Sequence, residues 1–596
     1  MLQKKWYVFG LLLLALVPVA PLPPYWLTLG NYIGLAAIVA LGLVLLTGVG
    51  GMTSFGQAAF VGLGAYTSAY LCTRFGLSPW IGLLAGLVLT GASAYLIGLI
   101  SVSLSGHYLP LGTIAWGLSL YYLFGNFEFL GKYDGINNIP AISIAGVALD
   151  SQGAMFYLIW AALLLAMLAL RNLLDSRPGR AMRAVKGGTG MAEAMGVDTR
   201  RMKIMMFVYA ALLASLSGWL YAHLQRAVNP TPFNVGNGIE YLFMAVIGGV
   251  GHAWGAVIGA GIFTVLKEFL QDGLPALFGT SASADIIVFG VLMILLLQYA
   301  REGLWPLLAR RMGPPRSARA PQQAMPLSQR AKPGKGELIL EVDGARKQFG
   351  GLVAVNDVSF SLHAGDIVGL IGPNGAGKST TFNLITGEIG LSAGTVRYLG
   401  TPIAGASSRA IAAAGIARSF QHVQLLPGMS VLENVALGAH LRGDFSRQGG
   451  FVPSMLRLNR NEENKLLHEA RVQLERVGLG DLLYADAASL ALGQQRILEI
   501  ARALCCDPAL LLLDEPAAGL RHLEKRALSV LLRKLQAEGM TVLLVEHDMD
   551  FVMGLTDRLV VMEFGTKIAE GTPAEIQRHP AVLEAYLGGV MEGEAA

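Results

Sequence analysis

The sequence predicts two parts of different fold class: an all-α polytopic membrane domain of about ten helices in residues 1–312, followed by an α/β domain in residues 337–596. At 596 residues the chain exceeds the size that one hydrophobic core usually supports. Apolar residues make up 53% of it and charged residues 14%, against about 25% charged residues in soluble proteins. Residues 1–312 carry 28 charges and residues 337–596 carry 53. These values exclude a disordered chain, a fibrous protein and an ordinary cytosolic enzyme.

The first half contains nine apolar runs, and a helix needs about 20 apolar residues to cross a bilayer. The runs are about 6–20, 27–47, 55–73, 79–103, 107–130, 154–172, 204–224, 239–270 and 283–300. We expect the first run to be an uncleaved helix rather than a signal peptide. Pro18 stands where cleavage needs a small residue, and Pro21 directly follows the only suitable site.

Basic residues predict the orientation of these spans. Segments 171–203 and 301–335 each hold eight Lys or Arg, whereas the polar loop 131–153 holds only Lys132. Positive charge marks the cytoplasmic side, so both basic segments are expected in the cytoplasm. An even number of spans must then separate them, so the run 239–270 crosses twice or not at all.

Glycines in the middle of the run 239–270 favour a break between two short helices. They are Gly248, Gly249, Gly251 and Gly255. Glu268 beside Lys267 is expected to mark a helix interface rather than a relay, because polar groups inside membranes most often join helices. No residue of this half identifies a transported solute.

Residues 313–336 form the connector between the two parts. They contain five prolines and five basic residues, with no acidic residue. This composition is typical of a flexible, semi-extended linker. Its positive charge is expected to lie against anionic lipid headgroups.

The second half begins with a phosphate-binding motif. Residues 366–371 read as a buried strand, and GPNGAGKST follows with Gly372, Gly377, Lys378 and Ser379 at the spacing G-x-x-x-x-G-K-[ST]. Glycines let backbone N–H groups curl around a phosphate, and the following helix directs its positive end at the same point. Lys378 supplies a cation and Ser379 a hydroxyl for Mg²⁺. The loop residues Asn374, Gly375 and Thr380 complete the expected ATP contacts.

Two further apolar strands are expected to end beside this loop. Leu510–Leu513 precedes Asp514 and Glu515, and Thr541–Val545 precedes His547 by two positions. Ligands collect at the carboxyl ends of parallel strands, so these side chains should converge on the nucleotide. Asp514 suits Mg²⁺ held through water, Glu515 can deprotonate the attacking water, and His547 can contact the γ-phosphate.

These motifs make residues 337–596 resemble the nucleotide-binding domain of an ABC transporter, a P-loop NTPase. The resemblance implies that Phe349 in KQFGG stacks on adenine and that Gln421 senses Mg²⁺ and the membrane domain. The family's LSGGQ signature, which completes the ATP site of a partner domain, is replaced by LALGQ at 490–494. Its expected contact residues are Ala491, Gly493 and Gln494. Ala491 lacks the usual hydroxyl, so the two ATP sites of an assembly are expected to be unequal.

The signature LALGQQRILEIARAL, DEPAAGL and the tail GTPAEIQRHPAVLEAYLG are similar to the ATPase subunits of branched-chain amino acid importers. A second departure is Arg521–His522, which stands where an acidic residue usually couples the two ATP sites.

The membrane half resembles the permease of the same system, through GMTSFGQAAFVGLGAY, GRAMRAVKGGTGMAEAMGVDTRRMKI and IEYLFMAVIGGVGHAWGAVIGA. The resemblance implies that the cytoplasmic loop of about 175–203 carries a coupling helix that seats in a groove of the ATPase. Its core is Met191, Ala192, Glu193, Ala194, Met195 and Gly196. The preceding Lys186–Thr189 lacks an acidic pair expected there, so the docking contacts are expected to differ.

Together the resemblances imply a permease fused to its ATPase, which takes up a small solute across the bacterial inner membrane with ATP and Mg²⁺. Branched-chain amino acids are the expected solute. The implied partners are a second permease, a second ATPase and an extracytoplasmic solute-binding protein, with membrane lipid around the spans and no nucleic acid. Two alternatives stay open: an ABC exporter half-transporter, which shares the domain order, and a nucleotide-binding regulatory membrane protein without turnover.

Overall fold

The computed structural model describes residues 15–21, 23–101, 108–278, 290–291, 294–295, 298–299, 303–309, 321, 323–443 and 450–591. The chain divides into two compact units. Met1–Leu174 and Arg200–Arg316 make the first, and Asp175–Thr199 with Ser317–Ala596 make the second. A segment from the middle of the membrane half therefore belongs to the second unit.

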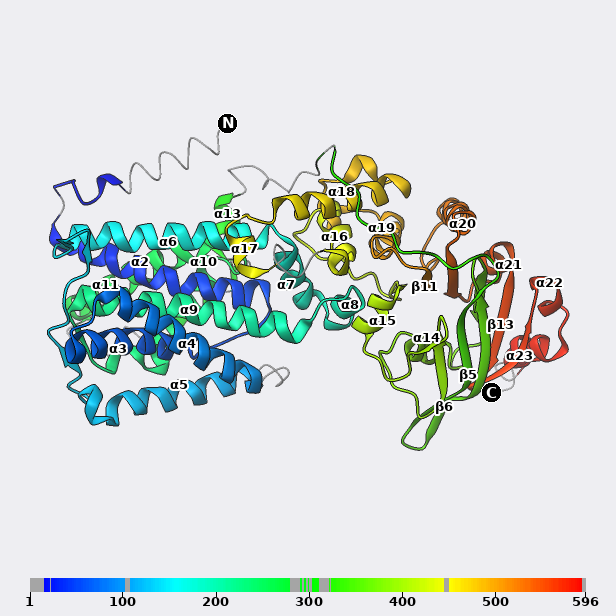
Figure 1. Cartoon of the computed structure of the whole chain (residues 1–596), viewed down its shortest axis with the longest axis horizontal. Helices are drawn as coiled ribbons and strands as arrows, with labels where there is room; N and C mark the ends of the chain where they lie inside the picture. Colours follow the sequence, from blue (N-terminus) through cyan, green and yellow to red (C-terminus); the bar gives the residue numbers. More distant parts are fainter. Residues whose placement is uncertain are drawn as a thin grey trace. The chain divides into compact units, whose positions relative to one another are not determined.

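The first unit is a helical bundle in which α2, α6, α9 and α11 run side by side (Figure 1). Its helices are α2 (Pro24–Leu43), α3 (Gln57–Phe75), α4 (Pro79–Ser101), α5 (Tyr108–Asn126), α6 (Gln152–Leu174), α9 (Thr199–Gln225), α10 (Val235–Gly248), α11 (Ala253–Phe278) and α13 (Leu304–Ala309). A π-helical turn, Val44–Val49, extends α2. Two short antiparallel pairs lie in the connections: β1 (Ile136–Asn137) with β4 (Ala227–Val228), and β2 (Ser143–Ile144) with β3 (Val147–Ala148).

Five helices of the described residues are long and apolar enough to cross a membrane. They are Pro24–Val49, Pro79–Ser101, Gln152–Leu174, Thr199–Gln225 and Ala253–Leu270. The predicted count of about ten is therefore not confirmed. Residues 6–14 of the first predicted span and most of the last, 283–300, lie outside the described residues.

The region predicted to contain a break is two helices, α10 and α11, separated by residues 249–252. Gly249 adopts φ +117°, a conformation that side chains with a Cβ rarely take. A Cβ at Gly248 would lie 1.7 Å from the carbonyl oxygen of Gly255, so the two helices meet backbone to backbone. The glycine cluster thus permits both the sharp turn and the close packing.

The second unit contains two sheets. The larger has the strand order β10-β11-β12-β7-β13-β14 and is parallel except for the β13–β14 hairpin. Its strands are β10 (Ile416–Arg418), β11 (Leu510–Asp514), β12 (Thr541–Val545), β7 (Ile367–Ile371), β13 (Arg558–Glu563) and β14 (Thr566–Gly571). Every residue of β7, β11 and β12 is buried, as expected for strands covered on both faces.

The smaller sheet is antiparallel, with the strand order β6-β5-β8-β9. Its strands are β5 (Leu338–Phe349), β6 (Leu352–His363), β8 (Ala393–Tyr398) and β9 (Thr401–Pro402). Leu340, Val342 and Phe360 of this sheet share one hydrophobic core with Leu370 and Leu512 of the larger sheet. The two sheets therefore fold as one body.

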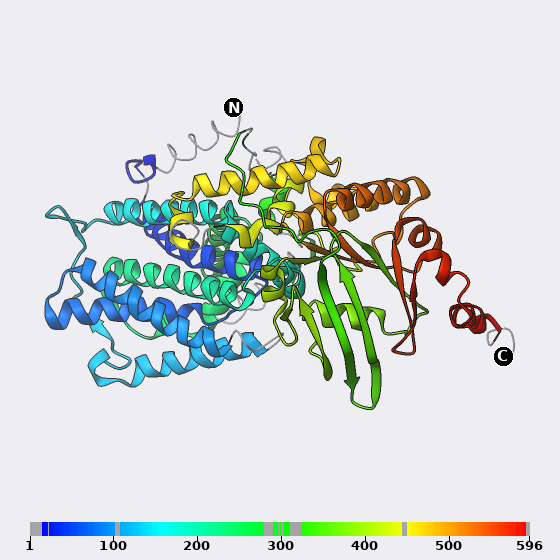
Figure 2. The same cartoon turned by 45° about the vertical axis from the view of Figure 1, so that its right-hand side comes forward.

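The described residues of this unit also form helices, and several of them flank the sheets (Figure 2). The helices are α14 (Lys378–Ile385), α15 (Ser408–Ala414), α16 (Val431–Ala436), α17 (Phe451–Met455), α18 (Arg460–Arg476), α19 (Leu492–Leu504), α20 (His522–Ala537), α21 (Met549–Leu555), α22 (Pro573–Ile576) and α23 (Pro580–Met591). Helix α16 begins with a capping box, in which Ser430 and Glu433 satisfy each other's backbone N–H groups. Residues 175–199 add α7 (Arg177–Gly187) and α8 (Thr189–Ala194) to this unit.

Candidate functional site

The phosphate-binding loop connects the end of β7 to the start of α14. Gly377, the residue before α14, has φ +93°, and a Cβ there would lie 2.5 Å from the carbonyl oxygen of Ala354. At Gly372 a Cβ would lie 2.1 Å from the carbonyl oxygen of Met562. Only glycine fits these two positions, and the resulting loop is a backbone cradle at a helix N-terminus. Strand, loop and helix follow in the order that the motif predicts.

Lys378 lies across this loop. Its Nζ donates hydrogen bonds to the carbonyl oxygens of Gly372 (2.7 Å) and Pro373 (2.9 Å). Burial lowers the pKa of this ammonium, while the carboxylates of Glu515 and Asp514 oppose that change. An ammonium has three donors, so one N–H remains to meet a phosphate oxygen.

Asp514 ends β11 and is 6% exposed. Its backbone N–H donates to Ser419 Oγ (3.0 Å), which fixes the strand end. Burial raises the pKa of its carboxyl group, and Oδ1 has no hydrogen-bond partner among the residues that the structure describes. A buried oxygen without a partner fits a ligand of Mg²⁺ or of its water shell, because such a site supplies the missing positive charge.

Glu515 follows directly and adopts φ +46°, which is uncommon for a residue with a Cβ. Its backbone N–H donates to the carbonyl oxygen of Val545 (2.9 Å), so the turn is held against β12. His547 Nδ1 lies 4.0 Å from Glu515 Oε2, and the histidine side chain is 59% exposed. The structure thus brings these two predicted residues together beside the loop, with the carboxylate partly buried and the imidazole open to solvent.

The other predicted nucleotide contacts are accessible. Ser379, Gln421, Asn374 and Gly375 are exposed, and Thr380 is half-buried. Phe349 ends β5, is 46% exposed, and has Lys347 Nζ 5.0 Å from its ring centroid. An exposed ring at the end of a strand is available for stacking.

The variant signature stands at the start of α19. Ala491 and Gln494 are exposed, whereas Gly493 is buried, where a Cβ would lie 2.4 Å from Glu524 Oε1. Gln494 Oε1 accepts a hydrogen bond from the Ala491 backbone N–H (3.2 Å). The predicted contact residue Gln494 therefore caps its own helix in this structure, and its Nε2 group remains for an external acceptor.

Sequence reasoning missed a buried polar network beneath the signature helix. Arg496 donates to the carbonyl oxygens of Phe420 and Gln421, and Arg502 donates to that of Gln424. Glu499 accepts from the Gln424 N–H (2.9 Å). This network ties α19 to the loop that carries Gln421. The sequence did contain a sign of this network: Arg496, Glu499 and Arg502 stand at i, i+3 and i+6, so the three charged side chains lie on one face of the helix.

The segment predicted to couple the two halves is buried in the second unit. Met191, Ala192 and Met195 are at most 1% exposed, and Ala194 is 5% exposed. Close packing leaves no room for a side chain at Gly196, where a Cβ would lie 2.1 Å from Leu441. Glu193 Oε1 accepts from Thr199 Oγ1 (2.6 Å) and stays half-buried. Helix α8 packs against α15.

Ion pairs hold the preceding helix α7 in the same unit. Arg177 pairs with Glu462 and Arg180 pairs with Glu463, both on α18. Arg183 Nη1 lies 3.5 Å from Glu433 of α16. The acidic partners thus belong to α16 and α18, and the basic residues belong to α7. Arginines at i, i+3 and i+6 of α7 therefore carry the basic side of these ion pairs.

Models of known protein families match both halves of the chain. Residues 25–297 match a family model described as "Branched-chain amino acid transport system / permease component". Residues 355–518 match "ABC transporter", and residues 566–591 match "Branched-chain amino acid ATP-binding cassette transporter".

Curated relatives match the second half. The high-affinity branched-chain amino acid transport ATP-binding protein LivG of Salmonella typhimurium is 43% identical over 253 residues, which are 42% of this chain and 98% of LivG. BraF of Pseudomonas aeruginosa, of the same description, is also 43% identical over 253 residues and 98% of its length. The crystal structure of a nucleotide-free ATP-binding cassette from an ABC transporter is 33% identical, covers 42% of this chain and 98% of its own, and has a TM-score of 0.37.

An ABC ATPase domain binds ATP with Mg²⁺ and couples hydrolysis to transport, and the apolar helices indicate a membrane protein whose ATPase domain is cytoplasmic. The chain belongs to the branched-chain amino acid ABC transporter family, with its permease and its ATPase fused in one polypeptide.

Proposed function

We propose that this protein imports branched-chain amino acids across the bacterial inner membrane at the expense of ATP. The supporting observation is that residues 175–199, which lie between two membrane spans in the sequence, are packed inside the ATPase unit. A movement of the ATPase therefore moves a piece of the permease directly. The names of LivG and BraF support the solute class.

The proposal divides the chain into a permease, residues 1–312, a basic linker, residues 313–336, and an ATPase, residues 337–596, with 175–203 as the coupling loop. In the ATP site, Lys378 and the glycine loop bind the phosphates. Ser379, Gln421 and Asp514 hold Mg²⁺ directly or through its water shell. Phe349 stacks on the adenine base. Glu515 accepts a proton from the attacking water, and His547 contacts the γ-phosphate.

Assembly follows from the chemistry of the site. Ala491 and Gln494 are exposed at the start of α19, with the buried Gly493 between them. We propose that these three signature residues complete the ATP site of a second ATPase. A second permease and an extracytoplasmic solute-binding protein complete the importer. The missing hydroxyl at Ala491 makes the two ATP sites unequal.

The test is reconstitution of the full chain with its companion polypeptides in proteoliposomes. We expect ATP on the ATPase side to drive leucine accumulation from the opposite side, and Glu515→Gln to slow phosphate release about 100-fold or more, the range for loss of a general base. Glu341→Gln, on an exposed pair with Arg397, is the matched control. Accumulation in the reverse direction would support an exporter, and phosphate release without solute movement would support the regulatory alternative.

A further inference from the structure

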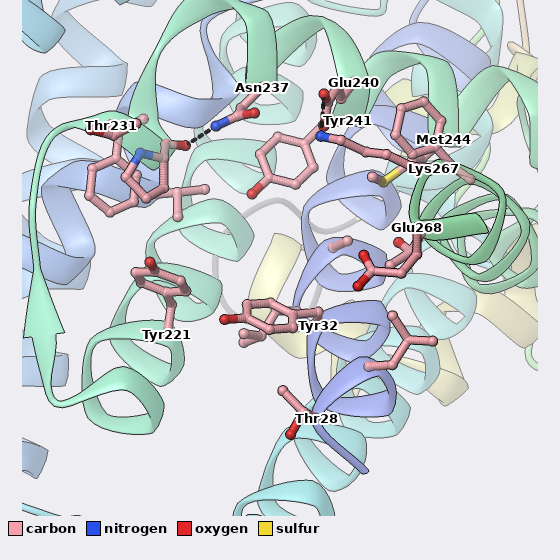
Figure 3. Close-up of a pocket in the computed structure, with 18 of the residues that line it drawn as sticks. Thr28, Tyr32, Tyr221, Thr231, Asn237, Glu240, Tyr241, Met244, Lys267 and Glu268 are labelled. Carbon is pink, nitrogen blue, oxygen red and sulfur yellow. Dashed lines mark hydrogen bonds and ion pairs between the residues drawn. The ribbon is translucent and has the colours of Figure 1, made fainter. Parts of the chain in front are cut away.

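The permease unit contains a cavity of about 570 Å³ between α2, α9, α10 and α11 (Figure 3). This volume lies within the range of pockets that bind small molecules. The cavity is lined by aromatic, apolar and charged side chains from helices far apart in the sequence.

The cavity lies toward the end of α9 that is remote from the first residue of this helix. Its lining residue Tyr221 stands 22 positions after Thr199, the first residue of α9, so the two are about 33 Å apart along the helix. Thr199 lies within the basic segment 171–203, which predicts the cytoplasmic side. The cavity therefore faces the extracytoplasmic side, where an importer receives its solute.

Three charged side chains line this cavity. Lys267 Nζ of α11 lies 2.6 Å from Glu240 Oε1 of α10, and the two side chains are 38% and 30% exposed. Lys267 thus joins two helices. The adjacent Glu268, expected to mark an interface, instead lines the cavity and has no hydrogen bond or ion pair with any described residue. Charge inside a membrane domain is costly and marks solute pathways.

Tyrosine side chains surround the same space. Figure 3 shows the hydroxyl groups of Tyr32, Tyr221 and Tyr241 and the carboxylate of Glu268 directed into it. Gln225 Nε2 donates to the Tyr32 hydroxyl, which fixes one of these rings. A carboxylate beside tyrosine hydroxyl oxygens suits an ammonium group, because the negative charge attracts the cation and the oxygens accept its hydrogen bonds.

The remaining wall is apolar. Leu35, Ala36, Val61, Met244 and Phe263 line the cavity. They can take up an aliphatic side chain and remove its surface from water. The cavity therefore offers one anionic, one cationic and one apolar region within a single enclosure.

We propose that this cavity is the solute site of the permease and binds a zwitterionic α-amino acid with an aliphatic side chain. Glu268 receives the ammonium group, and Lys267, which keeps N–H donors beyond its bond to Glu240, receives the carboxylate. The inference rests on the proposed function and adds to it the residues that recognise the two charged groups.

The test is equilibrium binding of radiolabelled L-leucine to the full chain in lipid nanodiscs. We expect Glu268→Gln to weaken leucine binding at least tenfold, which is the loss expected for a charged hydrogen bond. Competition with radiolabelled leucine tests the two charged groups separately. 3-Methylbutylamine carries only the ammonium group, so it should no longer displace leucine from Glu268→Gln. 4-Methylpentanoate carries only the carboxylate, so it should still displace leucine from this variant. The matched control is Glu128→Gln, on an exposed pair with Lys132 outside the cavity.

Leucine binding of equal strength in wild type and Glu268→Gln would overturn the inference and leave the import proposal standing. Absence of leucine binding to the wild-type nanodisc would also overturn it. The import proposal is judged separately by uptake in proteoliposomes, so the two failures are distinguishable. The double variant Glu240→Gln/Lys267→Met removes both charges of the pair together, so neither is left without its partner. It should abolish competition by 4-methylpentanoate and keep competition by 3-methylbutylamine, and competition by both compounds as in wild type would contradict the role of Lys267.

Discussion

Arg177 Nη1 lies 2.7 Å from Glu462 Oε1, and these side chains are only 3% and 10% exposed. The arginine belongs to the loop between two predicted spans and the glutamate to α18 of the ATPase. Burying two charges is costly, and the cost is recovered only while both partners remain in place. The pair therefore tolerates little separation between the coupling segment and α18.

Removing one partner of this pair should disconnect ATP hydrolysis from solute movement. In Arg177→Met, Glu462 is left as a buried charge, at a cost of about 3–5 kcal/mol. We expect the coupling segment to loosen, with leucine uptake falling at least tenfold and phosphate release persisting. The ratio of uptake to phosphate release in proteoliposomes measures this. Arg457→Met is the control, since Arg457 and Asp175 form an exposed pair at 3.9 Å that should be worth under about 1 kcal/mol. An unchanged ratio in Arg177→Met would contradict the role of the pair.

Lys378→Ala should weaken ATP binding about 10- to 100-fold, because the variant loses a charged hydrogen bond to phosphate. Fluorescent ATP titrated against the full chain gives the dissociation constant. Lys534→Ala, at an exposed position of α20, should bind as wild type does. Equal affinity in all three proteins would remove Lys378 from the phosphate site.

Asp514→Asn should raise the Mg²⁺ concentration needed for half-maximal phosphate release at least tenfold, since the amide is a weaker ligand than the carboxylate. The same change removes a buried charge whose pKa is raised by burial, so the melting temperature without Mg²⁺ should not fall. The control is Asp481→Asn, on the surface of the same unit. A lower melting temperature with normal Mg²⁺ dependence would indicate a structural role instead.

The packing around α7 should be sensitive to acid through His440. Burial, and then Arg177, Arg180 and Arg409, lower the pKa of His440 to about 3. The folded segment therefore keeps this ring neutral, while the unfolded chain binds a proton below about pH 6.5. The neutral His440 therefore contributes its full share to the free energy of unfolding above pH 6.5. This contribution is lost as the pH falls from 6.5 towards 3, by up to about 1.4 kcal/mol per pH unit.

Hydrogen exchange of residues 175–199 and 431–442 measures this loss, as protection factors corrected for the intrinsic pH dependence of exchange. We expect protection to fall about tenfold between pH 6 and pH 5 in wild type and to change far less in His440→Gln. His522→Gln, at an exposed position, should behave as wild type. A pH dependence that survives in His440→Gln would assign the effect to another group.

The parts of the fold that depend on local sequence were predictable. The glycine loop, the buried strands before Asp514 and before His547, and the break in the run 239–270 are encoded by neighbouring residues, and the structure has each of them. The number of spans was not predictable in the same way. Apolar runs such as 55–73 form a helix, α3, that carries Gln57 and Ser68 into the interior of the bundle.

Contacts between distant residues escaped prediction. Glu240 and Lys267 meet only because the chain turns back at residues 249–252, and no local pattern pairs them. The spacing of Arg177, Arg180 and Arg183 indicates a basic helix face, but their acidic partners on α16 and α18 lie some 250 to 285 positions later. The roles of the ATP-site residues stay predictions until the nucleotide is bound and measured.

The burial of residues 175–199 changes what the linker is needed for. LivG of Salmonella typhimurium matches 42% of this chain over 98% of its own length, and so corresponds to the ATPase half alone. In our proposal, residues 313–336 are the linker, and we expect this linker to raise the effective concentration of one partner near the other. Cutting the linker should leave the two fragments associated, so that covalent fusion governs how often they find each other and not whether they stay together.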